Sequence, residues 1–177
     1  MPGTSNPFLA GMPPGTTCCE GDSVPAESPV RVRGLVLIPG KTLSFGAVGH
    51  EAYGPGYPLF GPDGDSALFV NDPSLNGISG YNAPVDALVG VFLTDSEPIN
   101  NPAPPSLDFG PTGIGTDFPT LAPALQQIFF IGDGLTGTGT GTRQTFVVPS
   151  GATRLYLGVV DGFGWSNNIG SFIVAIE

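Results

Sequence analysis

The residues best suited to chemistry lie in one short segment near the C-terminus, from Asp161 to Asn168. It holds one carboxylate (Asp161), two adjacent amides (Asn167 and Asn168) and a large aromatic ring (Trp165), with glycines between them. Ca²⁺ prefers hard oxygen ligands, and glycines let the backbone approach an ion closely. An aromatic ring beside such an ion suits a sugar ring. The segment therefore predicts a calcium site that faces a glycan.

Two apolar, β-branched runs flank this segment, at 155–160 and 171–176. They predict two strands of a hairpin that carries the segment at its tip. A simpler reading makes Asp161 a turn residue. A tryptophan is more often a core or rim residue than a platform for a sugar. The position of Trp165 in a loop, between the small residues Gly164 and Ser166, nevertheless favours exposure.

Other apolar or alternating runs predict further strands, bounded by Pro and Gly turns. These runs are 30–38, 42–48, 87–93, 127–131 and 145–148. Together they suggest about eight strands and almost no helix, which is typical of an all-β, jelly-roll-like β-sandwich. The length of 177 residues favours a single domain.

Two segments differ in composition from the predicted strands. Residues 1–29 are rich in Pro, Gly, Ser and Thr and predict an extended N-terminal arm before a sandwich domain at 30–177. Residues 94–120 form a long Pro-rich insertion. Because the insertion contains Phe109 and Phe118, we expect it to pack on the domain rather than to act as a free linker.

Composition excludes several classes of function. Fifteen acids against five bases give a net charge of −10, so a nucleic acid or an anionic membrane surface is an unlikely partner. No apolar stretch has the length of a membrane helix, and membrane insertion is not expected. We expect a secreted or surface location. Because no signal peptide is recognisable after Met1, this location would mean that a leader has been removed and that Met1 is an added start.

The adjacent Cys18 and Cys19 leave their redox state open, because a bridge between neighbours is strained and rare. Free thiols or cross-links to another chain are the alternatives. Zinc is not supported, since His50 is the only histidine and there is no second cysteine pair.

Enzymatic signatures are absent from the sequence, and we expect no catalytic residues. A serine hydrolase would need a nucleophile motif of the form G-x-S-x-G, which does not occur. A glycosidase needs two facing carboxylates. Glu51 and Asp161 are candidates, but no pattern selects them.

Three blocks of sequence resemble the calcium-dependent, galactose-binding family of bacterial lectins typified by the galactophilic lectin of Pseudomonas. They are Pro39-Gly40 followed at the family's spacing by Ala52–Pro55, the run Gly61–Asp65, and the C-terminal D-G-x-G…N-N-x-G-S-F-x-V-x-I. The resemblance covers residues 35–93 and 127–177. The run Val148–Gly162 is also similar to a domain of secreted, surface-sorted bacterial proteins.

The resemblance implies a specific set of calcium ligands. They are the side chains of Asp161, Asn167 and Asn168 and the main-chain carbonyls of Tyr53 and Trp165, with sugar hydroxyls completing the shell. Asp161, Trp165 and Asn167 would also contact the sugar. The family's sugar-contacting His and Gln have no match here, so calcium binding carries over better than galactose binding.

Two hypotheses of function follow. In the first, the protein is a secreted, calcium-dependent, lectin-like domain that binds glycans through an oligomer. In the second, it is a structural subunit of an extracellular fibre or surface layer, assembled through the N-terminal arm, with calcium only structural.

Overall fold

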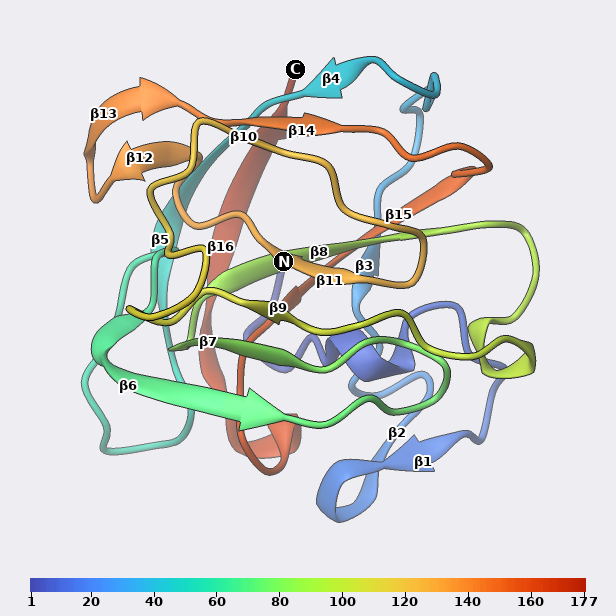
Figure 1. The fold of residues 1–177 in the computed structure, drawn as a ribbon. Coiled ribbons are helices and arrows are strands. Elements are labelled where there is room, and N and C mark those ends of the chain that lie inside the picture. The colour runs from blue at the N-terminus through green and yellow to red at the C-terminus, as the bar shows by residue number, and fades with distance from the viewer.

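The computed structural model describes residues 1–177 and contains β-strands and short 3₁₀ turns, with no α-helix (Figure 1). None of its helical turns is long and apolar enough to cross a membrane. The four 3₁₀ turns are η1 (Pro7–Leu9), η2 (Cys19–Gly21), η3 (Pro98–Asn100) and η4 (Trp165–Asn167).

A four-stranded sheet lies at the centre of the molecule. Its strands follow the order β11 (Ile128–Phe130), β8 (Leu88–Leu93), β15 (Arg154–Val159) and β3 (Val30–Arg31). Every residue of β8 and β11 is buried, because other elements cover both faces. This explains why these two strands read as continuous apolar runs rather than alternating ones.

Smaller sheets surround this one. β5 (Phe45–Ala52) pairs along its full length with β16 (Ile169–Ile176), and Figure 1 shows the two running together across the direction of β8. The others are β6 (Asp65–Asp72) with β7 (Tyr81–Val85) and β9 (Leu107–Asp108); β10 (Thr120–Leu121) with β14 (Thr145–Val147) and β4 (Thr42–Leu43); β1 (Thr17–Cys18) with β2 (Asp22–Ser23); and β12 (Leu135–Gly137) with β13 (Thr140–Arg143).

One core of 31 buried residues joins the sheets, and phenylalanines dominate its centre. Phe129 lies 5.1 Å from Phe92 and 5.3 Å from Phe146 between ring centroids. Such aromatic pairs add to the free energy already gained by burying the rings. The prediction of an all-β sandwich is confirmed.

The strands predicted from the sequence agree only in part with those in the structure. The runs at 87–93, 127–131, 145–148, 155–160 and 171–176 all form strands. The strand expected over 30–38 is wrong beyond Arg31, and Val36 there is 78% exposed. The strand expected to end at Val48 continues to Ala52. The run at Asp65–Asp72 was not predicted, because none of its residues is buried and they show no clear alternation.

Residues 1–29 are not a free arm, which corrects the expectation of an extended one. Phe8 is only 2% exposed and stacks on Tyr81, with 5.6 Å between ring centroids, and its edge meets Trp165 at 6.1 Å. The start of the chain also hydrogen-bonds to β16, where the Met1 amino group donates to the carbonyl of Phe172 at 2.7 Å. The apolar patch around Phe8 gains free energy by entering the core.

The insertion at 94–120 packs on the domain, as expected. Phe109 and Phe118 are both buried, and their ring centroids lie 6.0 Å apart. Phe109 also approaches Phe130 of β11 at 5.9 Å.

Replacing Phe8 by Ala should lower the free energy of unfolding by about 3–5 kcal/mol, because it removes a buried ring and leaves a cavity. Chemical denaturation measures the change. The control is Phe163→Ala, which removes a ring that is 74% exposed and should change stability by less than about 0.5 kcal/mol. Equal effects would mean that the N-terminal segment does not hold the core together.

Candidate functional site

Four separate parts of the chain meet at one end of the sandwich. They are the end of β5, the turn between β7 and β8, the segment after β15 and the start of β16. The β5–β16 register places Gly170 opposite Glu51. The backbone N–H of Asp86 donates to the carbonyl of Val160 at 2.8 Å, which brings the β7–β8 turn beside Asp161.

Asp161 lies directly after β15 and is only 5% exposed. Its Oδ1 accepts the backbone N–H groups of Gly162 at 2.5 Å and Phe163 at 3.3 Å. Its Oδ2 is buried and has no hydrogen bond. Burial raises the pKa of Asp161 to about 6, although the two N–H groups act in the opposite direction. One carboxylate oxygen is thus anchored to the backbone, and the other has no hydrogen-bond partner.

Asn168 is buried beside Asp161, whereas Asn167 is exposed. The Asn168 Nδ2 donates to the carbonyl of Gly3 at 3.2 Å, and its Oδ1 is buried without a partner. The Asn167 amide lies by Gly54, where an added Cβ would come within 3.2 Å of Nδ2. Of the ligands implied by the resemblance, Asp161 and Asn168 therefore offer unpaired oxygens.

The structure adds two carboxylates that the sequence analysis did not select for this site. Glu51 and Asp86 are both 0% exposed, and none of their four carboxylate oxygens has a hydrogen bond. Glu51 follows the inward positions Phe45 and Ala47 of β5 at a period of two, so a strand predicted through Ala52 would have pointed it inward. Asp86 carries no local signal.

The carboxylates lie close enough to influence one another. Burial and then the neighbouring Asp86 carboxyl raise the pKa of Glu51 well above its usual range, with Asp161 contributing less. Burial likewise raises the pKa of Asp86. Asn168 lies next to both Glu51 and Asp161. The four side chains form one buried polar cluster, named here the acidic cluster: Glu51, Asp86, Asp161 and Asn168.

The donor set suits a hard cation. Buried polar groups in proteins are nearly always hydrogen-bonded, so an orphaned oxygen calls for an explanation, and a bound ion is one. All donors in the acidic cluster are oxygens, as Ca²⁺ requires. No three acidic, imidazole or thiol side chains are arranged to hold one ion. A site here would therefore combine at most two carboxylates with amide and carbonyl oxygens.

An open pocket of about 330 Å³ lies over Asp161. Tyr53, Tyr57, Phe163 and Asn167 line it, and the rings of Tyr53 and Tyr57 stand 4.2 Å apart. Tyr57 is 53% and Phe163 74% exposed, so both present apolar surface to solvent.

A second, more apolar hollow of about 340 Å³ adjoins this pocket. The two share Tyr53, Asp161 and Phe163. Leu68 and Val70 line this hollow together with Phe163. A ligand over Asp161 could therefore extend from the first pocket onto further apolar surface.

Trp165 is not a sugar platform, which corrects the expectation that its ring is exposed. It is 1% exposed, and its Nε1 donates to the carbonyl of Val159 at 2.8 Å. Phe163 and Tyr57 take the exposed aromatic positions instead. The sequence could have indicated that Phe163 is exposed, because its neighbours Gly162 and Gly164 have no side chains to cover the ring. The Trp165 carbonyl accepts the N–H of Asn168 at 3.1 Å and retains one free lone pair.

Asp22, from the N-terminal segment, fixes the loop that carries Trp165. Its Oδ2 accepts the backbone N–H of Trp165 at 2.9 Å, and its Oδ1 accepts that of Ser166 at 3.2 Å. Asn6 donates to the same carboxylate at 2.9 Å. A carboxylate at the start of a helical turn satisfies N–H groups that the turn cannot pair.

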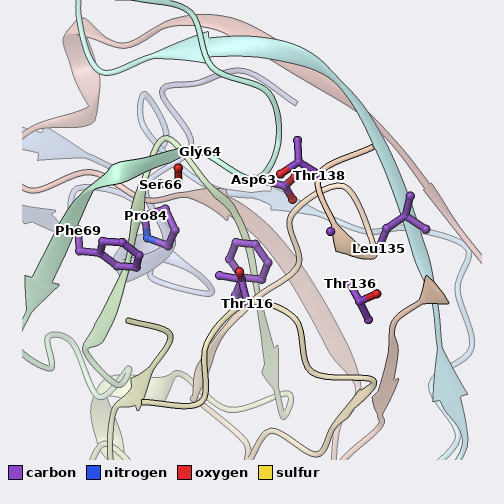
Figure 2. Close-up of a pocket in the computed structure, with 11 residues that line it drawn as sticks. Asp63, Gly64, Ser66, Phe69, Pro84, Thr116, Leu135, Thr136 and Thr138 are labelled. Atoms are coloured by element: carbon purple, nitrogen blue, oxygen red, sulfur yellow. The ribbon is translucent and has the colours of Figure 1, made fainter. Parts of the chain in front are cut away.

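Another cavity, of about 270 Å³, contains none of the predicted site residues (Figure 2). Figure 2 shows Thr138, from the β12–β13 hairpin, beside Asp63, with Thr116 and Thr136 at other places in the lining. Asp63 accepts the backbone N–H of Asp133 at 2.9 Å. The Oδ2 of Asp63 is also buried without a hydrogen bond, but Asp63 is only partly buried, whereas Glu51 and Asp86 are fully buried.

A scan of the sequence against models of protein families finds no match, and no curated protein sequence matches the chain. The resemblance to the galactose-binding lectins therefore rests on the sequence blocks themselves.

Asp22→Ala should lower the free energy of unfolding by about 1.5–3 kcal/mol, because buried N–H groups lose a charged acceptor. Thermal unfolding followed by the fluorescence of Trp165, the only tryptophan, measures the change. Asp95→Ala is the matched control, since the Asp95 carboxylate accepts a single, exposed hydrogen bond from Thr153. Identical stability of the two variants would contradict a fixing role for Asp22.

Proposed function

We propose that this protein binds glycans through a calcium ion held at Asp161. The observation that carries the proposal is the unpaired, buried Oδ2 of Asp161, a residue that lines an open pocket together with exposed aromatic rings. A polar floor with a hard oxygen donor suits an ion, and an apolar rim suits the carbon-bound face of a sugar.

The residues that would hold the ion are those implied by the resemblance. Asp161, Asn167 and Asn168 would contribute side-chain oxygens, and Tyr53 and Trp165 would contribute carbonyls. The ion, when bound, offers open coordination positions to two vicinal hydroxyls. The backbone N–H groups on Oδ1 of Asp161 hold the carboxylate in place, and the Gly3 carbonyl fixes the Asn168 amide.

The aromatic partner of the sugar is Phe163, assisted by Tyr57, and not Trp165. Phe163 lies two residues from Asp161, so its ring borders the space above the ion site. Each site of this kind binds weakly, and an oligomer would gain avidity by presenting several. We propose a secreted or cell-surface location and a galactose-like ligand on the same grounds as the resemblance.

The alternative of a self-assembling structural subunit loses its main motivating feature. Phe8, Asp22 and Gly3 all engage the protein's own domain, so the N-terminal segment is already paired. Donating this segment to a neighbour would first require breaking these contacts. Electron microscopy of the purified protein tests the alternative, because regular polymers would support it.

Calorimetric titration of chelator-treated protein with Ca²⁺ should show binding that Asp161→Asn weakens at least about tenfold. The amide keeps the size of the side chain but removes its charge. Asp95→Asn, an exposed carboxylate outside the pocket, should bind Ca²⁺ like the wild type. An Asp161→Asn variant with unchanged calcium affinity would refute the proposed ion site.

Phe163→Ala should weaken calcium-dependent glycan binding by about tenfold and leave calcium affinity unchanged, since the ring contacts the sugar and not the ion. A glycan array with and without Ca²⁺ identifies the ligand, and titration then measures the loss. Ile173→Ala is a matched control, because Ile173 has the same 74% exposure on β16. Equal glycan affinity in both variants would show that Phe163 is not the platform.

A further inference from the structure

We propose that Glu51 and Asp86 hold a second divalent cation, buried behind the one at Asp161. The set of ligands implied by the resemblance includes neither residue. The inference stands on the interior of the acidic cluster and does not depend on sugar binding.

The first argument is the number of unpaired oxygens. Glu51 and Asp86 are 0% exposed, and all four of their carboxylate oxygens lack a hydrogen bond. A carboxylate that is buried as an ion needs several hydrogen bonds or a cation to replace its lost hydration. The two carboxyl groups lie within hydrogen-bonding reach of each other, so either a cation or a proton shared between them must compensate their charge.

The second argument is the orientation of Asn168. Its Nδ2 is tied to the carbonyl of Gly3 at 3.2 Å, so its buried, unpaired Oδ1 points away from Gly3. The side chain lies next to Glu51 on one side and Asp161 on the other. An amide oxygen that is buried without a partner beside a group of carboxylates is a second sign of a ligand that accepts oxygen donors.

The third argument is charge. The only ion pair in the structure joins Arg143 to Glu177, whose side chains are 48% and 69% exposed. The acidic cluster therefore has no basic partner, although it gathers three carboxylates. One divalent cation at Asp161 would leave the inner pair of carboxylates uncompensated, and a second cation neutralises them.

The geometry of the chain supports a closed site. A Cβ at Gly3 would lie 2.6 Å from Cγ and 2.9 Å from Oε1 of Glu51, so the N-terminal segment covers this carboxylate directly. Asp86 adopts φ +67° at the β7–β8 turn, a conformation that Asp tolerates better than most residues. An ion between Glu51 and Asp86 would tie the end of β5 to this turn and would have no contact with a glycan.

The ligand class follows from the donors. The carboxylates of Glu51 and Asp86 supply only oxygen donors, which favours Ca²⁺ or Mn²⁺ over the softer metals that need nitrogen or sulfur. The test uses Ca²⁺ alone, without sugar. Native mass spectrometry counts the ions on the full chain, and calorimetry measures their affinities.

The wild type should bind two calcium ions per chain. The double variant Glu51→Gln/Asp86→Asn, whose amides match the carboxyls in size, should bind one. Asp161→Asn should weaken or lose the other ion. Two ions, with a different one affected in each variant, support the proposal. Loss of one ion in the double variant with no effect of Asp161→Asn also supports it, and contradicts the ion site of the proposed function instead.

A single ion that the double variant retains with unchanged affinity would overturn the proposal, and the carboxyl pair would then share a proton. A wild type that binds no calcium would overturn both sites. Crystals of the wild type soaked in Mn²⁺ give a check that does not depend on how the variants fold. An anomalous peak between Glu51 and Asp86 is expected, and a peak only at Asp161 would contradict the inner site.

Discussion

Three carboxylates buried together without a basic residue are the constraint around which this end of the molecule is built. A carboxylate that is buried as an ion loses far more hydration energy than packing returns. Buried carboxyl groups therefore bind a cation, accept hydrogen bonds or take up a proton and become neutral. Asp161 has two backbone N–H groups on one oxygen, whereas Glu51 and Asp86 have none. The acidic cluster therefore departs from the usual pattern of satisfied buried polar groups, and such departures are expected at functional sites.

The N-terminal segment is part of the site's support. Its apolar residues enter the core through Phe8, its Asp22 carboxylate holds the Trp165 turn, and its Gly3 carbonyl orients Asn168. Each contact acts on a different part of the site, so the loop geometry depends on residues more than 140 positions away in the chain. The buried indole of Trp165 belongs to this support, since it anchors the loop from below while Phe163 stands free above it.

The polar and the apolar residues of the pocket occupy different parts of it. The floor supplies hard oxygens whose positions are set by the backbone and by strand pairing, which suits an ion that needs fixed ligands. The rim supplies Phe163 and Tyr57, which remain exposed because no neighbouring element covers them. An apolar hollow continues past Phe163, so a ligand larger than one sugar ring would find further surface there.

The sequence by itself determined the all-β class, the strands at 87–93 and 155–160, and the candidate loop with Asp161 and Asn168, because these depend on local periodicity and local residue chemistry. Only the tertiary structure decided that Trp165 is buried and that Glu51 and Asp86 lie beside Asp161. Burial of the indole depends on Phe8, far away in the chain, and the meeting of the carboxylates depends on the pairing of β5 with β16 and of the β7–β8 turn with the end of β15. Such contacts join segments that share no local pattern, so their positions follow from how the sheets pack and not from any one stretch of residues.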